Sequence, residues 1–241
     1  MLFNFLLKKS NFIFKPFGLQ LSYISNSEKR KYEWLKNHNI DSVIDIGANQ
    51  GQFALKINSA IKPAVIYCFE PTTVAFTSLE KNTRIFNNIK RLQIGIGDSN
   101  KKMEININSY SPSSSILALS NYHKNSYPDF LETTTETIQI ATLDSLVADQ
   151  KVKLTSTTLL KIDVQGFEKF VLLGAKQSLK VLKMVYLEVS FIEMYANQPL
   201  FGEVYDFLIA ENFVFIGADN LASDEHTAQP LFFDAYFIRK F

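Results

Sequence analysis

Ser42-Val43-Ile44-Asp45-Ile46 is a short apolar run, and Gly47-Ala48-Asn49-Gln50-Gly51 follows it directly. A run of this length that ends at a glycine is typical of a buried strand, and the apolar spacing over residues 52–61 is typical of a helix. The segment therefore predicts a strand, a tight turn and a helix, which is the unit from which parallel α/β sheets are built.

The same alternation continues along most of the chain. We expect strands at residues 42–46, 65–69, 92–96, 158–162, 184–189, 213–216 and 232–238, and helices at residues 27–39, 52–61, 73–86, 167–182 and 201–212. Strands that alternate with helices form parallel units with right-handed crossovers. The sequence therefore predicts an α/β fold with a doubly wound, mostly parallel sheet of about seven strands.

The middle of the chain departs from this rhythm. Residues 103–108 and 137–141 alternate apolar and polar side chains, which predicts half-exposed strands. The polar segment 109–128 between them is longer than most connections, and we interpret this small β insertion after the third strand as a substrate-side element. We expect an N-terminal helical extension at residues 1–40 and a single main domain at residues 41–241.

The composition excludes some classes of partner and bond. The chain has 241 residues, 46% of them hydrophobic, and a net charge of +1, which does not favour a nucleic-acid partner. The single cysteine, Cys68, excludes an intramolecular disulfide, and we interpret it as a small buried side chain in a cytoplasmic protein. Residues 1–20 are basic and aromatic, so we expect them to pack over the core, with peripheral membrane contact as the alternative.

Each of the first five expected strands brings a carboxylate to its carboxyl end. The residues are Asp45, Glu70, Asp98, Asp163 and Glu188. In open α/β sheets a ligand binds beyond the carboxyl ends of the strands. The sequence therefore predicts one acidic ligand site at this edge of the sheet.

A dinucleotide is the first ligand to consider for the turn after the first strand. The glycine pattern is Gly47-x-x-x-Gly51, and Asn49 stands in place of the middle glycine that lets the backbone approach a pyrophosphate. Asp45 would also repel a phosphate, by about 1 kcal/mol at about 4 Å even in water. The turn suits the amine and the sulfonium of S-adenosylmethionine better than it suits phosphates.

Glu70 lies 23 positions after Gly47, at the end of the next expected strand. An acidic residue at this distance is suited to accept hydrogen bonds from a ribose diol. Asp98 would then lie beside the adenine. Both residues also have simpler interpretations, Glu70 as a carboxylate at a helix N-terminus and Asp98 as a residue of a turn.

Five motifs occur in order along the chain: Asp45-Ile46-Gly47-Ala48-Asn49-Gln50-Gly51, Phe69-Glu70-Pro71, Gly97-Asp98, Thr142-Leu143-Asp144-Ser145-Leu146 and Leu160-Lys161-Ile162-Asp163-Val164-Gln165-Gly166-Phe167-Glu168. Together they resemble the FkbM-type methyltransferase family. The resemblance implies the Rossmann-like class I methyltransferase fold with a reversed last strand, and O-methylation of sugars, glycolipids or secondary metabolites by S-adenosylmethionine. The cofactor-binding residues that it implies are Asp45, Gly47, Ala48, Asn49, Gln50, Gly51, Glu70, Pro71, Gly97, Asp98, Ser114 and Asp163.

One position departs from the family pattern, which reads Asp-Val-Glu-Gly after the fourth strand. Gln165 stands where that glutamate is expected. An amide can accept a hydrogen bond but cannot take up a proton, so any role of that glutamate as a base or a metal ligand is lost. This departure keeps open the alternative of a non-catalytic adenosyl-binding module.

An alcohol acceptor must lose a proton on methylation, so we expect a base within hydrogen-bond reach. Asp163 is the first candidate because its strand lies next to the first strand. Lys161, on the same face two residues earlier, would steer the acceptor or keep Asp163 ionised, unless the two form a purely structural pair. Glu188 and His123 are further candidates for catalysis.

Glu168 is a weaker candidate, because a carboxylate in the first turn of a helix has a simpler explanation. A divalent metal stays open, since Asp163, Glu168 and Glu188 are hard oxygen donors but show no ligand spacing that demands one. An NAD-dependent oxidoreductase is the remaining alternative; Asn49 disfavours it, and no catalytic set of Ser, Tyr and Lys can be placed. The oligomeric state and the acceptor stay open.

Overall fold

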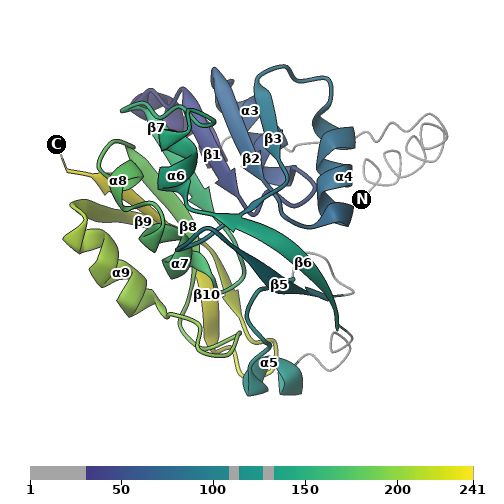
Figure 1. Ribbon diagram of the computed structural model, residues 1–241. Helices are drawn as coiled ribbons and strands as arrows, with labels where there is room; N and C mark the ends of the chain where they lie inside the picture. Colours follow the sequence, from purple (N-terminus) through teal and green to yellow (C-terminus); the bar gives the residue numbers. More distant parts are fainter. Residues whose placement is uncertain (1–30, 109–113, 127–132, 241) are drawn as a thin grey trace, which may run out of the picture.

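The main sheet has seven strands in the order β3-β2-β1-β7-β8-β10-β9 (Figure 1). A computed structural model describes residues 31–108, 114–126 and 133–240. The strands of this sheet are β1 (Ser42–Ile46), β2 (Val65–Phe69), β3 (Ile89–Leu92), β7 (Thr158–Ile162), β8 (Met184–Ser190), β9 (Phe213–Ser223) and β10 (Pro230–Arg239). The pairs from β3 to β8 are parallel, whereas β10 is antiparallel to both of its neighbours. The predicted fold class, with its reversed last strand, is therefore confirmed.

Helices cover both faces of the sheet. One layer contains the 3-10 helix η2 (Trp34–His38), α3 (Gln52–Ile61) and α4 (Thr73–Thr83), and the other contains α6 (Leu143–Ala148), α7 (Glu168–Leu173), α8 (Lys176–Leu179) and α9 (Phe201–Ala210). Successive strand residues pack into opposite cores: Val43 and Cys68 pack with the first layer, and Ile44 packs with the second. Burial on both faces explains why the strands appear as continuous apolar runs.

The insertion after the third strand forms a separate three-stranded sheet in the order β4-β6-β5. Its strands are β4 (Gly95–Ile96), β5 (Lys101–Asn108) and β6 (Thr133–Ala141), and the short helix α5 (Asn121–Ser126) lies in the connection between β5 and β6. Ile105, Ile138 and Ile140 give this sheet a small apolar core of its own. It projects from the main sheet toward α5 (Figure 1). Residues 109–113 and 127–128 of the predicted polar segment lie outside the described residues.

The third strand differs from its prediction at residues 92–96. β3 is earlier in the chain, because buried Ile89 pairs with Ile66 of β2. Ile96 instead pairs with Ala141 of β6 in the insertion sheet. The segment that we interpreted as one strand therefore contributes to two different sheets.

The long helix predicted at residues 167–182 is also wrong, because it is interrupted at Gly174. A Cβ atom at Gly174 would lie 1.9 Å from the carbonyl oxygen of Gly97, so the two backbones are in direct contact there. The carboxylate of Asp144 accepts hydrogen bonds from the backbone N–H groups of Gln177 (2.9 Å) and Ser178 (2.8 Å). These bonds satisfy the start of α8 and make it a separate helix.

Only the end of the predicted N-terminal extension can be compared with the structure. Within it, Leu35 of η2 is buried against the core that contains α3. Residues 1–30, which include the segment with possible membrane contact, lie outside the described residues. Among the helices of the described ranges, none combines the length and the apolar character that crossing a bilayer requires.

Candidate functional site

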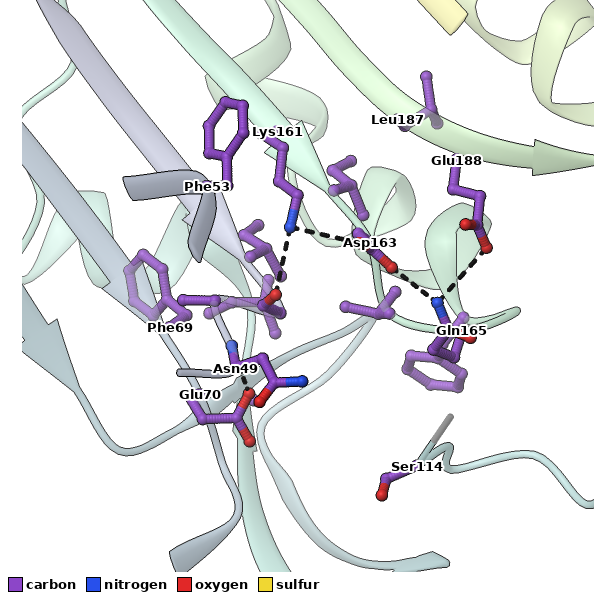
Figure 2. A pocket seen from close by; sticks show the side chains of 18 of the residues that line it. Asn49, Phe53, Phe69, Glu70, Ser114, Lys161, Asp163, Gln165, Leu187 and Glu188 are labelled. Atoms are coloured by element: carbon purple, nitrogen blue, oxygen red, sulfur yellow. Dashed lines mark hydrogen bonds and ion pairs between the residues drawn. The ribbon is translucent and has the colours of Figure 1, made fainter. Parts of the chain in front are cut away.

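A cavity of about 500 Å³ opens at the carboxyl ends of the central strands. One end is formed by the β1–α3 loop and the end of β2, and the other by β8 and β10. Lys161 and Asp163 lie between Asn49 and Glu70 on one side and Gln165 and Glu188 on the other (Figure 2). Its size and position match those of ligand sites in doubly wound folds.

The β1–α3 loop is pressed against the end of β7. A Cβ atom at Gly47 would lie 1.8 Å from the carbonyl oxygen of Asp163, and Gly47 has a φ of 75°. Backbone N–H groups of Gly47 and Ala48 both donate to the carbonyl of Phe69, at 3.0 and 2.9 Å. Only glycine combines this positive φ with so close a backbone approach.

Glu70 lines the cavity and also organises the loops around it. Its Oε2 accepts a hydrogen bond from the backbone N–H of Asn49 (3.0 Å), and its Oε1 accepts from Thr72 N (3.0 Å) and Thr72 Oγ1 (2.5 Å). A carboxylate offers about four acceptor positions, so Oε2 keeps one for a ligand. Burial raises the pKa of Glu70, and the hydrogen bonds from Thr72 and Asn49 oppose that rise.

Asn49 presents a second unused acceptor to the cavity. Within the described residues, its buried Oδ1 atom has no hydrogen-bond partner. A buried acceptor without a partner costs stability unless a ligand or water satisfies it. Together with Glu70, this atom makes the β1–β2 end of the cavity a site for hydrogen-bond donors.

Lys161 connects the loop to the sheet. Its Nζ lies 3.1 Å from Asp45 Oδ1, 3.6 Å from Asp163 Oδ2 and 3.2 Å from the carbonyl oxygen of Gly47. Burial lowers the pKa of Lys161, but the charges of Asp45 and Asp163 outweigh that effect and raise it. Asp45 is fully buried and does not line the cavity, so its role here is to hold Lys161 under the loop.

Gln165 joins the two carboxylates at the far end of the cavity (Figure 2). Its Nε2 donates to Asp163 Oδ1 (2.8 Å) and to Glu188 Oε1 (3.4 Å), while its Oε1 accepts from Tyr195 Oη (2.8 Å). Ser115 Oγ donates to the backbone carbonyl of Gln165 at 2.6 Å. Burial, followed by the charge of Asp163, raises the pKa of Glu188 well above its usual range. The amide therefore supplies the donor that lets the two carboxyl groups lie close together.

Glu168 supports this arrangement from outside the cavity. Its Oε1 accepts hydrogen bonds from the backbone N–H groups of Val164 (3.0 Å) and Gly166 (3.2 Å), which fixes the loop that carries Gln165. Burial raises the pKa of Glu168 to about 7. It is a residue of the first helical turn, and it does not line the cavity.

The raised pKa of Glu168 predicts a stability that falls as pH rises. Its pKa is about 7 in the folded chain against an ordinary 4.5, so the folded state binds more protons between these values. The full benefit is present below about pH 4.5 and is lost as pH rises to about 7, at most about 3 kcal/mol. Glu168→Gln keeps the accepting oxygen and cannot ionise. The free energy of unfolding is measured in urea at pH 5 and at pH 8. We expect it to fall less between these two pH values in the variant than in the wild type.

The matched control for this measurement is Glu80→Gln, on the exposed face of α4. It should leave the pH dependence of the wild type unchanged. Equal slopes for the wild type and Glu168→Gln would contradict the assignment.

Several of the predicted site residues line the cavity and others do not. Gly47, Ala48, Asn49, Glu70, Pro71, Ser114, Lys161, Asp163 and Glu188 line it. Asp45, Gln50, Gly51, Gly97, Asp98 and His123 do not. The expectation of a common cavity for Asp45, Glu70 and Asp98 therefore holds only for Glu70.

Physical reasons account for two of the residues that do not line the cavity. Asp98 lies in the turn after β4, where it pairs with Lys101 at 3.1 Å and accepts from Ser99 Oγ at 2.9 Å. Hydrogen-bond partners in the turn thus hold its carboxylate, as in the simpler interpretation. His123 is buried in α5 with its ring 5.8 Å from that of Tyr195. Because His123 does not line the cavity, it is not in position to act as a base for a ligand there.

The sequence interpretation missed the residues that β9 and β10 contribute, which are Asn220, Phe232 and Asp234. A single acidic residue inside the apolar strand 232–238 was the available signal for Asp234. Among the described residues, no group of three or more His, Cys, Asp or Glu side chains is placed to hold a metal ion.

Comparisons with known proteins place these residues in context. The sequence model described as Methyltransferase FkbM domain matches residues 45–215. The 2-O-methyltransferase NoeI of Sinorhizobium fredii is 25% identical over 173 residues, which cover 69% of this chain and 70% of that protein.

Two solved structures are similar to the chain as a whole. M. jannaschii TYW2 in complex with AdoMet is 14% identical, with a TM-score of 0.41 and coverage of 91% of this chain and 80% of that one. Magnesium protoporphyrin IX methyltransferase from Synechocystis with bound SAM is 10% identical, with a TM-score of 0.47 and coverage of 89% and 78%.

Proposed function

The chain belongs to the FkbM methyltransferase family, and we propose that it transfers a methyl group from S-adenosylmethionine to a hydroxyl group of a sugar, a glycolipid or a secondary metabolite. The observation that carries the proposal is one cavity of about 500 Å³ whose lining includes the hydrogen-bond acceptors of Asn49 and Glu70 and the carboxyl group of Asp163. The relative NoeI is a 2-O-methyltransferase, which supports oxygen as the methylated atom.

The residues at the β1–β2 end fit S-adenosylmethionine. Glu70 keeps an acceptor position suited to a ribose hydroxyl, and Asn49 Oδ1 is suited to an N–H or O–H donor. Carboxyl groups of Asp163 and Glu188 line this part of the cavity, and they suit a cationic sulfonium better than a phosphate. Gly47 lets the loop that carries Asn49 lie against the end of β7, where a side chain would collide with the carbonyl of Asp163.

S-adenosylmethionine supplies an electrophilic methyl group on sulfur, and an acceptor oxygen takes this group as the carbon–sulfur bond breaks. Asp163 takes the proton that the acceptor hydroxyl loses. Lys161 and Gln165 contact the two different oxygens of Asp163, at 3.6 and 2.8 Å, so each oxygen is held in place by one contact. These contacts also aim the carboxylate into the cavity, which is the positioning that general base catalysis requires.

Calorimetric titration with S-adenosylhomocysteine, NAD and NADP tests the proposed cofactor. We expect S-adenosylhomocysteine alone to bind. Binding of NAD or NADP alone would refute the proposal in favour of an oxidoreductase. Mass spectrometry of cell extracts incubated with the protein and a labelled methyl donor then identifies the acceptor, and the absence of any labelled product would favour a non-catalytic binding module.

Glu70→Ala should weaken the binding of S-adenosylhomocysteine by about 1–3 kcal/mol, the usual range for hydrogen bonds to a charged group. Calorimetry measures the change directly. Asp98→Asn is the matched control, because Asp98 is also an acidic residue at a strand end but does not line the cavity. We expect its affinity to equal that of the wild type. If Asp98→Asn lost affinity for S-adenosylhomocysteine and Glu70→Ala did not, the cofactor contact would belong to Asp98 and not to Glu70.

A further inference from the structure

Three residues from β9 and β10, namely Asn220, Phe232 and Asp234, form a wall of the cavity that we call the β10 wall. All three lie beyond residue 215, where the match to the family ends. The loops near Asn49 and Glu70, the base candidate Asp163 and Glu188 all lie within the match. The wall therefore lies outside the stretch that the family model matches, as does Tyr32, which also lines the cavity.

Asp234 lies directly beside Glu188 in the sheet. The two residues are partners in the antiparallel pair of β8 and β10, so their side chains project from the same face. Asp234 Oδ2 accepts hydrogen bonds from Tyr186 Oη at 2.6 Å and from Asn220 Nδ2 at 2.5 Å. Both bonds use one oxygen, and no hydrogen bond to Oδ1 is found among the described residues. Oδ1 keeps its acceptor positions for a ligand.

Both donors to Asp234 are held in place. Tyr186 stacks on Tyr236 with ring centroids 4.4 Å apart, and burial raises the pKa of Tyr186, so its hydroxyl remains a donor. The residues paired with Phe232 and Asp234 are Ala222 and Asp219, so β9 has one extra residue there. Such a bulge turns a side chain to a new direction, and it carries Asn220 with a φ of 49°.

The charges around the wall select against an anionic ligand. Glu188 and Asp234 carry the acidic groups, and the lining cations among the described residues are Lys161 and Lys56. Lys161 is already bound to Asp45, Asp163 and the Gly47 carbonyl. Lys56 belongs to helix α3 and not to the β10 wall. A phosphate or carboxylate at the β10 wall would meet the carboxyl groups of Asp234 and Glu188, neither of which can neutralise its charge. Hydroxyl groups, which donate to carboxylates, need no such neutralisation.

We propose that the β10 wall binds a second hydroxyl of the acceptor, with Asp234 Oδ1 as the hydrogen-bond acceptor and the ring of Phe232 against an apolar face. The ligand is thus a neutral polyhydroxylated ring. One of its hydroxyl groups lies at Asp163 and is methylated, and a second, nearby hydroxyl group binds the β10 wall. This inference rests on the proposed function, and it makes Asp234 and Asn220 residues that determine acceptor specificity.

The test measures binding without turnover. The protein is saturated with S-adenosylhomocysteine and titrated with the methyl glycosides of glucose, galactose, mannose and rhamnose, and with methyl glucuronide as the anionic counterpart of methyl glucoside. Saturation-transfer NMR reports the affinities. We expect at least one neutral glycoside to bind saturably and the glucuronide to bind more weakly than the glucoside.

Asp234→Asn should weaken the binding of the glycoside by about tenfold or more, as loss of a charged hydrogen-bond acceptor does. Asn220→Ala should weaken it in the same direction, and both variants should keep the wild-type affinity for S-adenosylhomocysteine, which also shows that they fold. Asp206→Asn, which removes an exposed charge from α9, is the control and should bind like the wild type.

Two results would overturn the inference: no neutral glycoside binds the wild type saturably, or Asp234→Asn binds the glycoside as the wild type does. Failure of S-adenosylhomocysteine to bind the wild type is a different result, and it would refute the proposed function instead.

Discussion

Gly47→Ala is expected to abolish binding of S-adenosylhomocysteine, and Gly47→Val to do so with a larger loss of stability. The added Cβ would lie 1.8 Å from the carbonyl oxygen of Asp163, a distance that no relaxation of one side chain can relieve. The residue must also keep a φ of 75°, which costs a non-glycine residue roughly 1–2 kcal/mol. The loop has to move away from β7, and Asn49 moves with it. Calorimetry should detect no heat of binding.

Gly202→Ala is the matched control for this change. A Cβ atom at Gly202 has no heavy atom within 4 Å, and the residue lies in helix α9, where alanine is favoured over glycine. We expect this variant to bind like the wild type and to melt at the same or a slightly higher temperature. Unchanged affinity of a folded Gly47→Ala protein would show that the β1–α3 loop is not the cofactor site.

The parts of the fold that the sequence predicts well are those set by local signals. β1, α3, β2 and β7 have the bounds that were expected, because each apolar run is ended by a glycine, a proline or a charged residue within a few positions. The third strand failed for the opposite reason. Leu92, Ile94 and Ile96 alternate with Gln93 and Gly95 as they would in one strand, and only the pairing of Ile96 with Ala141 shows that the chain has changed sheets.

The candidate site divides in the same way. Gly47, Glu70 and Asp163 could be named because the carboxyl ends of parallel strands meet at one edge, a rule that needs only the order of the strands. Asp98 was placed by the same rule and missed the cavity, since its strand belongs to the insertion sheet. Asp234 could not be named, because it reaches the cavity through antiparallel pairing with β8.

The contacts of Gln165 show a further limit of sequence reasoning. Because the family pattern has a glutamate at this position, we interpreted Gln165 as the loss of a carboxylate. In the structure it is a donor between Asp163 and Glu188, and Tyr195 Oη fixes which end of the amide faces them. A third carboxylate at this position would repel both neighbours. The substitution therefore fits a site in which Asp163 alone acts as the base.

Asp163→Asn is expected to lower kcat for methyl transfer by about 10²- to 10⁴-fold, the contribution of a positioned general base. The asparagine keeps the shape of the side chain but cannot take the acceptor proton. Binding of S-adenosylhomocysteine should change little, because Asn49 and Glu70 are untouched. The measurement is the transfer of a labelled methyl group to the acceptor identified in extracts, with the affinity determined on the same sample. A kcat near that of the wild type would exclude Asp163 as the base.

Gln165→Glu separates the base from its positioning. The new carboxylate replaces a donor to Asp163 Oδ1 with a negative charge, and a like charge beside a carboxyl group opposes the loss of its proton. The rise of kcat with pH should therefore occur at a higher pH in the variant than in the wild type. At high pH, kcat of the variant should return part of the way to the wild-type value. Gln150→Glu adds the same charge at an exposed residue with a similar φ, 58° against 54°, and should leave the profile in place. A profile that moves equally in both variants would mean that net charge, rather than the contact with Asp163, controls the base.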